Sequence, residues 1–240
     1  MKEMRLDKFL TQMGTGTRSE VKKILKNGGI TINGVTVKKP ESKVDPEKDL
    51  VICLGKQLRY QPYIWLMFHK PAGCITATSD RFRKTVMDYI DCDRKEELFP
   101  VGRLDIDTEG LLFLTNQGDL AHRMLSPRHH VEKTYFVRTD DRITQEDAAA
   151  MELGLDIGEE KKTLPADLKI LDSEDGCEAE LTICEGKYHQ VKRMFQARGK
   201  QVCYLKRISM AGIRLDEELD PGKWRYLSEE ETERVRMMTC

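Results

Sequence analysis

The sequence predicts an α+β protein in two parts: a small module of helices and a hairpin, then a larger domain on a mostly antiparallel mixed sheet. Three observations predict this. A capped helix is followed by two short β-branched runs around Asn33-Gly34, the strongest short hairpin signal. Residues 133–138 and 178–184 alternate polar and apolar side chains, as half-buried strands do. Strand patterns also outnumber helical ones in the second part, and several are joined by tight turns.

The first part is predicted from helical spacing and capping residues. Residues 5–13 place Leu6, Phe9 and other apolar side chains on one helical face. Thr17 and Glu20 have the spacing of a capping box that begins a second helix, and Gly28-Gly29 ends it. With the hairpin these helices form a compact module, so we expect one domain over residues 1–59 and a second over 60–240.

Charge is distributed unevenly between the two parts. Residues 1–60 hold 13 Lys or Arg against 7 Asp or Glu, a net of +6, although the whole chain has a net charge of -1. The basic residues lie mostly on the two predicted helices and around their junction. Such a surface suits a polyanion, but solvated lysines on a small helical domain would look the same.

Cysteine usage and hydropathy indicate the compartment. The seven cysteines include no CxxC pair and have no metal-like spacing, which is typical of reduced thiols in a cytoplasmic protein. No apolar run approaches the roughly 20 residues needed to span a bilayer, and the N-terminus lacks the apolar stretch of a signal peptide. We therefore expect a cytoplasmic protein with no membrane partner.

The sequence pattern of the second part predicts strands that alternate with short helices. We expect a buried strand at 64–68 that ends in a turn at 69–73, and a second buried strand at 111–114. Later strands are expected at 202–208 and 211–215. Helices are expected at 86–90, at 119–125 and at 190–198, the last closed by Gly199. Two more are expected from their ends: one is capped by Thr144 and ends at Gly154, and one begins at the Ser228–Glu231 capping box.

The segment 101–118, VGRLDIDTEGLLFLTNQG, is the candidate centre of the chemistry. It places Arg103, Asp105, Asp107 and Glu109 within seven residues, directly before an apolar run. A loop that presents one carboxylate and is anchored by a buried strand has this pattern, and Asp105 is our candidate. On an extended backbone Asp105 and Asp107 would share a face. Spacing alone allows a carboxylate pair for glycosidic chemistry, a D-x-D metal site, or a charged turn without a catalytic role.

Several long motifs, in order, narrow these alternatives. HKPAGCITAT, GRLDIDTEGLLFLTNQGD, SPRHHVEKTYFV and LTICEGKYHQVKRMF together resemble the RsuA branch of the pseudouridine synthases, which isomerise uridine in ribosomal RNA. Residues 4–50 resemble the S4 RNA-binding domain. The likeness therefore implies an S4-like module followed by a pseudouridine synthase domain. The segment SPRHH to EKTY is most similar to members that act on small-subunit (16S) rRNA; action on 23S rRNA and a non-catalytic role in ribosome assembly are the alternatives.

The resemblance also implies roles for individual residues. Asp105 matches the essential aspartate, and Asp107 a frequent companion without that role. Tyr135 matches a tyrosine that packs against the target base, and Lys192 the basic residue that pairs with the aspartate. Charge and resemblance together indicate a set of RNA contacts: Arg5, Lys8, Arg18, Lys22, Lys23, Arg103, Arg128, His129 and Arg193. We expect no metal, no cofactor, a monomer, and rRNA as partner, either naked or in a partly assembled small subunit.

The residue types suit this isomerisation. The N1–C1′ bond breaks, the uracil turns, and it rejoins through C5. A charged Asp105 could attack C1′ or assist loss of a ribose proton, and Lys192 within about 4–6 Å would favour that charge. A base within folded RNA must be flipped out at a cost of a few kcal/mol, which stacking on Tyr135 would offset. His129 and His130 are adjacent, so they would point to opposite faces and suit a shared metal poorly.

Overall fold

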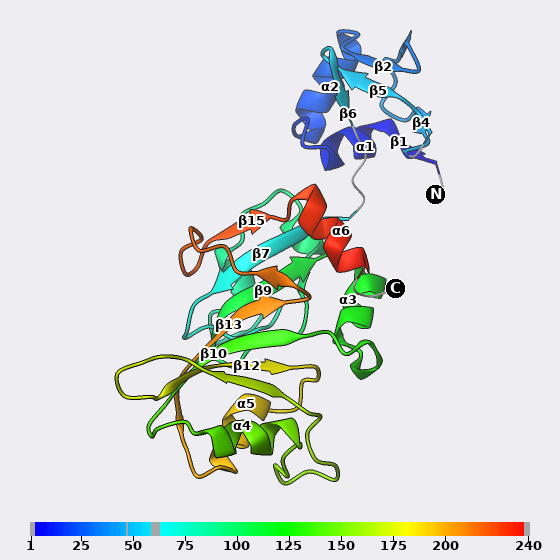
Figure 1. Ribbon diagram of the computed structural model, residues 1–240. Helices are drawn as coiled ribbons and strands as arrows, with labels where there is room; N and C mark the ends of the chain where they lie inside the picture. The colour runs from blue at the N-terminus through cyan, green and yellow to red at the C-terminus, as the bar shows by residue number, and fades with distance from the viewer. Residues whose placement is uncertain (1–2, 47, 59–62, 238–240) are drawn as a thin grey trace. The chain divides into compact units, whose positions relative to one another are not determined.

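The computed structural model describes residues 3–46, 48–58 and 63–237, and the chain divides into two units, Met1–Tyr63 and Ile64–Cys240 (Figure 1). The domain boundary expected between residues 59 and 60 lies outside the described residues. No helix in the described ranges is long and apolar enough to cross a membrane. The six described cysteines are all free thiols.

The N-terminal unit contains the predicted helix pair and hairpin. Helices α1 (Leu6–Gln12) and α2 (Arg18–Lys26) pack over a four-stranded sheet of order β3-β2-β5-β6. Its strands are β2 (Ile30–Ile32), β3 (Val35–Thr36), β5 (Val51–Cys53) and β6 (Lys56–Leu58), and β1 (Met4–Arg5) pairs with β4 (Lys43–Val44). The unit has its own apolar core, formed by side chains of both helices and of the sheet.

Local chemistry explains these elements. The Thr17 hydroxyl accepts from the Glu20 backbone N–H, and the Glu20 carboxylate accepts from the Thr17 N–H at 2.7 Å, so the capping box is confirmed. Asn33 and Gly34 both have positive φ, as the two-residue hairpin turn requires. The Asn33 side chain also donates to Asp49 and accepts from the Leu50 N–H, which fixes the turn against the next segment.

The C-terminal unit is built on a nine-stranded sheet. The main path has the order β11-β12-β10-β13-β9-β7-β15, with β14 paired to β13 and β8 to β9. All described pairings in it are antiparallel except that of β9 with β13, so the predicted mostly antiparallel mixed sheet is confirmed. The bounds are β7 (Trp65–Lys70), β8 (Phe99–Pro100), β9 (Glu109–Thr115), β10 (Lys133–Thr139), β11 (Asp167–Ile170), β12 (Glu178–Ile183), β13 (Val202–Met210), β14 (Ile213–Arg214) and β15 (Trp224–Tyr226).

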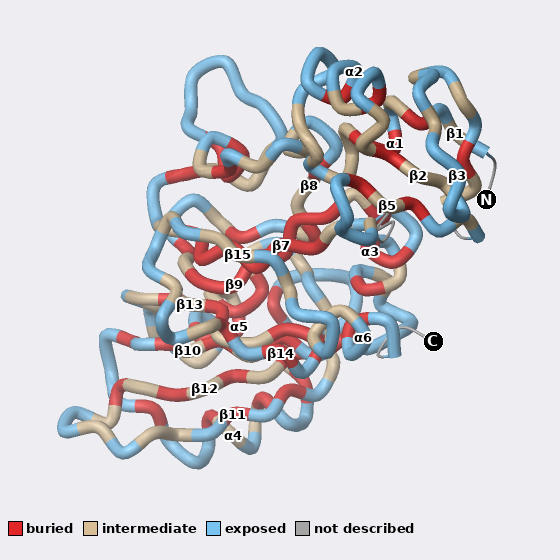
Figure 2. Tube along the Cα trace, turned by 90° about the horizontal axis from the view of Figure 1, so that it is seen from above, coloured by how far each residue is buried: buried red, intermediate tan, exposed pale blue. Residues whose placement is uncertain are grey.

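Helices cover both faces of this sheet. Alternate residues of β9 enter different cores: Leu112 lies in the same core as Val191 of α5 (Gln190–Gln196), and Leu111 in the same core as Leu120 of α3 (Gly118–Leu125). We call these the α5 face and the α3 face. Helix α4 (Gln145–Glu152) lies on the α5 face, and α6 (Glu229–Met237) on the α3 face. Figure 2 shows the result: β7 and β9 are buried along most of their length.

Three 3₁₀ helices complete the unit: Val86–Tyr89, Lys95–Glu97 and Pro127–His129. The predicted helices near 86–90, 119–125 and 190–198 are confirmed, as are those capped by Thr144 and Ser228. One detail of the prediction is wrong. Residues His69 and Lys70, expected in a turn, continue β7 by pairing with β9, and the chain leaves the strand at Pro71.

Candidate active site

The loop that carries the two aspartates is held by a buried lysine. Lys70 has no exposed surface, and its Nζ donates to the backbone carbonyls of Thr108 (2.8 Å) and Asp105 (2.9 Å). The Pro71 carbonyl accepts at 3.1 Å. Burial lowers the pKa of Lys70, and nearby acids oppose this shift. The ammonium thus fixes the backbone of the loop rather than an acid side chain.

The aspartate loop is a turn, contrary to the extended backbone considered above. The Thr108 N–H donates to the Asp105 carbonyl at 3.1 Å, and residues 106–107 form the turn. On its other side Thr76 accepts from the Leu104 N–H and donates to the Leu104 carbonyl at 2.8 Å. Asp105 is therefore positioned by hydrogen bonds on both sides.

Both carboxylates converge on helix α5. Lys192 Nζ donates to Asp107 Oδ1 and Oδ2 at 2.6 and 2.8 Å and lies 3.4 Å from Asp105 Oδ2. His189 Nε2 lies 3.4 Å from the other Asp105 oxygen, Oδ1. The predicted pairing of Lys192 with Asp105 is present, but the shorter contacts are those with Asp107. Lys192 thus lies between two acids.

The two acids differ in environment. The Asp105 side chain is 30% exposed and that of Asp107 is 66% exposed. Burial raises the pKa of Asp107, but the hydrogen bond and charge of Lys192 outweigh it, so this pKa lies below its usual value. Asp105 makes no contact as short as those of Asp107, and its oxygens face two potential cations. It is the more enclosed carboxylate, and its contacts with Lys192 and His189 are longer than those of Asp107 with Lys192.

Tyr135 lies on β10 but is almost enclosed. Only 8% of it is exposed, and it packs in the same apolar core as Leu104 and Val191, the neighbours of Asp105 and Lys192 in sequence. Tyr135 therefore lies on the α5 face beneath the site. A base could reach only the small exposed part of this side chain in the present conformation.

Sequence reasoning did not assign the aromatic surface beside Asp105. Tyr188 is 68% exposed and stacks on His189, with ring centroids 3.8 Å apart and planes 19° apart. His189 adopts the left-handed conformation at the start of α5, which is unusual for a non-glycine residue. An aromatic residue beside a histidine in GKYHQ was the available signal, but only the fold places the pair at the aspartate.

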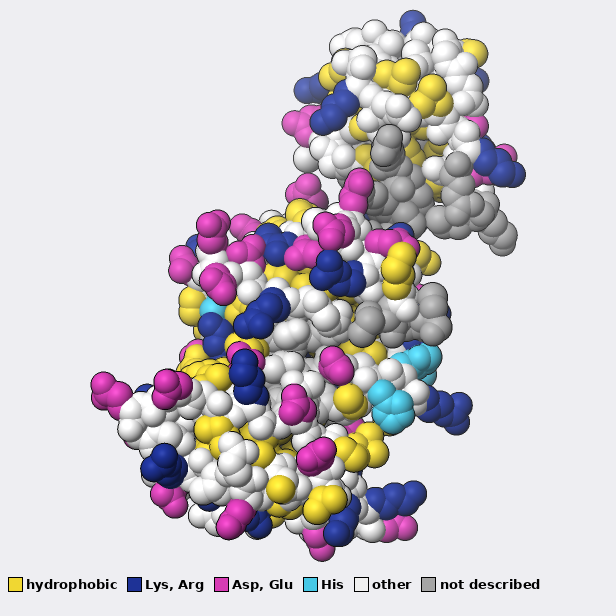
Figure 3. Space-filling model, viewed as in Figure 1, with side chains coloured by type: hydrophobic (Ala, Val, Ile, Leu, Met, Phe, Trp, Pro, Cys, Tyr) yellow, Lys and Arg dark blue, Asp and Glu magenta, His cyan; other side chains and the backbone are white. Residues whose placement is uncertain are grey.

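The predicted RNA contacts of the N-terminal unit lie on its surface. Lys8, Arg18, Lys22 and Lys23 are all exposed on the two helices. Arg5 is also exposed, but its guanidinium pairs with Asp7 at 2.7 Å. Over the face of the molecule shown in Figure 3, basic and acidic side chains are interspersed.

In the C-terminal unit, Arg103, Arg128 and His129 are exposed, whereas Arg193 is engaged within the protein. Its guanidinium pairs with Glu159 at 2.7 Å and also donates to the Tyr188 and Ile157 carbonyls. These bonds tie α5 to the 157–159 segment. Arg193 is thus a structural residue in this conformation, and its predicted contact with RNA would require breaking them.

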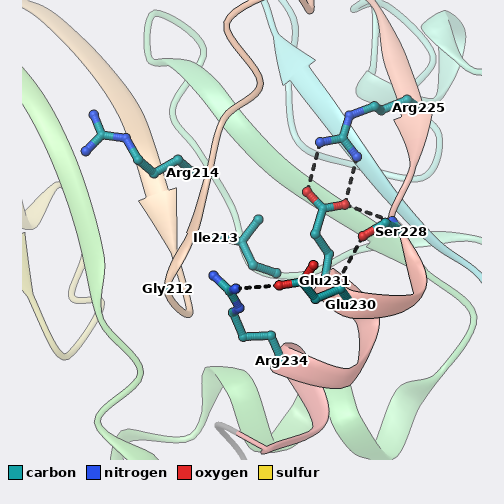
Figure 4. Close-up of a pocket in the computed structure, with 8 residues that line it drawn as sticks. All are labelled: Gly212, Ile213, Arg214, Arg225, Ser228, Glu230, Glu231 and Arg234. Carbon is teal, nitrogen blue, oxygen red and sulfur yellow. Dashed lines mark hydrogen bonds and ion pairs between the residues drawn. The ribbon is translucent and has the colours of Figure 1, made fainter.

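A cavity of about 570 Å³ lies elsewhere in the unit, between β14 and the start of α6 (Figure 4). Four of its five charged groups are paired with one another: Arg225 binds Glu231 at 2.8 Å and Arg234 binds Glu230 at 3.0 Å. The fifth, Arg214, lies 3.9 Å from Glu180, outside the cavity lining. This cavity is on the α3 face and anchors the terminal helix, so we do not place the site there. In the described ranges no group of three or more His, Cys, Asp or Glu could hold a metal ion.

Comparisons with known proteins find matches for both units of the chain. Residues 64–197 match the family model described as RNA pseudouridylate synthase, and residues 4–51 match the S4 domain. An uncharacterized RNA pseudouridine synthase of Bacillus subtilis is 46% identical over 95% of this chain and 96% of its own length. The ribosomal small subunit pseudouridine synthase A of Vibrio vulnificus is 42% identical over 97% and 99%.

A crystal structure of a pseudouridylate synthase has the same fold. It superposes with a TM-score of 0.68 and 38% identity, covering 97% of this chain and 99% of that one. The family model matches more than half of the chain, and the relatives cover nearly all of it. This chain therefore belongs to the RNA pseudouridine synthase family.

Proposed function

We propose that this protein converts a uridine of small-subunit ribosomal RNA to pseudouridine, with Asp105 acting at C1′ of the target ribose. The main observation that supports this proposal is the position of the partly exposed Asp105 carboxylate. It lies between Lys192 and His189, on a loop fixed by Lys70. The choice of substrate is supported by relatives about 40% identical that are named for the ribosomal small subunit.

The geometry suits both chemical routes considered for this isomerisation. In the first, Asp105 Oδ attacks C1′ as the bond to N1 breaks, and the acylal re-opens when C5 bonds to C1′. In the second, the carboxylate takes the proton at C2′ and a glycal forms. Each route needs the carboxylate oriented towards the sugar, and Lys192 and His189 hold one carboxylate oxygen each.

RNA binding is divided between the two units in this proposal. The exposed lysines and Arg18 of the N-terminal helices would bind phosphates, mainly reading RNA shape. Near Asp105, Arg103 would contact backbone phosphate, as would Arg128 and His129. The exposed Tyr188 ring offers a stacking surface for a nucleotide next to the flipped one, and Tyr135 supports the base at the floor. The protein would work as a cytoplasmic monomer without cofactor.

Mapping pseudouridine across all rRNA in cells with and without the gene tests the proposal. We expect one site in 16S rRNA to lose its modification and to regain it with the wild-type gene but not with Asp105→Asn. Loss of a 23S site would move the substrate to the large subunit. If no site changes while the purified protein binds rRNA without converting it, the protein is an assembly factor and the proposal is wrong.

A further inference from the structure

One row of the main sheet places Arg207, which the proposed chemistry has not used, between Lys70 and Tyr135, which it has. Across neighbouring strands, Lys70 pairs with Gly110, Gly110 with Arg207, and Arg207 with Tyr135. Directly paired residues point to the same face of a sheet. Lys70 follows Phe68 and Arg207 follows Leu205 at a spacing of two, and both of these are core residues of the α5 face. Arg207 thus lies in the floor of the site, between the lysine that holds the Asp105 loop and Tyr135.

Arg207 is buried and incompletely bonded. It is 2% exposed; Nε donates to the Leu111 carbonyl at 2.7 Å, and Nη2 has no hydrogen-bond partner among the described residues. A buried guanidinium N–H without an acceptor is costly, so an unmade bond of this kind calls for an explanation. Nη2 is buried in the present conformation, so a substrate acceptor reaches it only when binding opens the packing above it; that acceptor would then supply the missing bond.

A second buried cation lies close by. Lys133 precedes Tyr135 by two residues on β10, so it points to the same face, and it is 8% exposed. Its Nζ donates to the Val131 carbonyl at 2.8 Å. Burial, with the charge of Arg207, lowers its pKa to about 8. Among the described residues no carboxylate forms an ion pair with Lys133 or Arg207, and Glu185 acts on Lys133 only from a distance. The floor of the site therefore holds two buried cations without a carboxylate in contact.

The reaction produces negative charge on the base. When the C1′–N1 bond breaks, its electron pair stays on the uracil, and the charge spreads over N1, O2 and O4. The sugar carbon is meanwhile bonded to Asp105 or becomes part of a glycal. C5 then bonds to C1′, and on the glycal route Asp105 returns its proton to C2′. The proton lost from C5 is matched by one gained at N1, so atoms and electrons balance without a further reactant. A cation on a carbonyl oxygen stabilises this detached anion more than it does the neutral bound uridine.

We propose that Arg207 Nη2, supported by the neighbouring Lys133 ammonium, donates to a carbonyl oxygen of the target uracil and stabilises the detached base as an anion. This inference rests on the proposed function, because it assigns a role within the same site. It makes Arg207 a catalytic residue with a task different from that of Lys192: Lys192 serves the carboxylate, and Arg207 serves the leaving group.

The test compares Arg207→Met with the wild type in single-turnover reactions at saturating enzyme, on rRNA fragments that carry uridine or 5-fluorouridine at the target. Fluorine makes the uracil anion more stable, so the base then needs less help to leave. Because fluorine cannot leave C5 as a cation, the readout for both substrates is loss of the N1-linked nucleoside after nuclease digestion. We expect Arg207→Met to slow uridine by roughly 100-fold, as removal of one donor to a developing anion does, and 5-fluorouridine by clearly less.

Controls separate this role from a structural one. Lys206→Met removes a charge from the adjacent residue of β13, which points to the opposite face, and we expect both substrates to react as with the wild type. RNA affinity and thermal unfolding are measured for every variant. If Arg207→Met does not fold, Arg207→Lys and Lys133→Met replace it, and a smaller loss with the same substrate dependence is expected.

Two outcomes would overturn the inference. Equal slowing of both substrates by the folded variant would place Arg207 outside leaving-group stabilisation, and unchanged rates would show that Nη2 does not touch the base. Failure of the proposed function is distinct from both, because the wild-type protein itself would then leave uridine in rRNA unconverted.

Discussion

The basic residues of the two units are placed in opposite physical situations. In the N-terminal unit Lys8, Arg18 and Lys22 project from helices into water. In the catalytic unit, Ile64–Cys240, Lys70 and Arg207 are buried and aimed at particular oxygen atoms. Exposed charges act over a distance and are screened by salt, whereas buried ones act at contact and are screened little. In our proposal the same residue types therefore serve affinity in one unit and chemistry in the other.

The largest effect expected is that of Asp105→Asn, which removes the charge from the group at C1′. We expect single-turnover isomerisation to fall by roughly three orders of magnitude or more, as for loss of a nucleophile, while RNA affinity stays within about twofold because the side chain is not a phosphate contact. The matched control is Asp107→Asn, which leaves Lys192 its partner Asp105 and should cost less than about tenfold. If Asp107→Asn is the inactive variant, the roles of the two acids are exchanged.

Lys192→Met is expected to have the next largest effect. It removes the cation 3.4 Å from Asp105, and we expect roughly a 100-fold loss of single-turnover rate. Because Lys192 is only 25% exposed, this factor should be the same at 50 and 200 mM salt, about the range over which surface charges lose influence. Lys192→Arg keeps the charge and should recover part of the rate. A loss that disappears in high salt would mean that Lys192 acts as a surface phosphate contact instead.

Much of the fold could be predicted because its signals are local. The capping boxes at Thr17 and Thr144 and the turn at Asn33-Gly34 each depend on residues a few positions apart, and all are present. Strands that form only by pairing with a segment far away in the sequence were missed. β15 is three residues long and exists by pairing with β7, more than 150 residues earlier, and short strands of this kind carry no pattern of their own.

The residues of the candidate site also differ in how far the sequence could predict them. Asp105 and Lys192 could be named from motifs, although the sequence could not show that Lys192 would bind Asp107 more closely. The roles of Lys70 and Arg207 depend on sheet register, which sets which distant residues share a row, and neither was assigned from the sequence. The burial of Tyr135 likewise follows from the packing of α5 over the sheet.

Charge reversal in the N-terminal unit should act on affinity and spare the chemistry. We expect the triple variant of Arg18, Lys22 and Lys23 to Glu to weaken rRNA binding by about tenfold or more at low salt, and to reduce the slope of log affinity against log salt by about 2 if all three bind phosphate. The rate at saturating RNA should change little. Reversing Lys39, Lys43 and Lys56, which are equally exposed but lie outside the two helices, is the matched control. An equal loss in both triples would show that total charge, not the helical face, governs binding.

The smallest effect on activity is expected at Asp147, where the catalytic unit uses cations for stability alone. This acid is the partner of Thr144 in the capping box of α4, with a side chain 1% exposed, and it pairs with Arg198 at 2.9 Å and Lys200 at 3.1 Å. Burial raises its pKa, but the hydrogen bonds from Thr144, Arg198 and Lys200 outweigh this and lower it to about 2. A carboxyl that titrates lower in the folded state than in the unfolded one stabilises the fold above its unfolded pKa, and this contribution disappears as the pH falls through its folded pKa.

We therefore expect Asp147→Asn to lower the free energy of unfolding of the catalytic unit by about 2 kcal/mol at pH 7, from a depression of nearly two pKa units. The difference from the wild type should shrink as the pH falls from about 4 towards 2, the interval between the unfolded and folded pKa values. Urea unfolding followed by tryptophan fluorescence measures this unit alone, because Trp65 and Trp224 are the only tryptophans of the chain and both lie in it. A difference that stays constant down to pH 2 would mean that the acid contributes through packing and capping rather than through its charge, and the contrast between the two units would then be one of burial only.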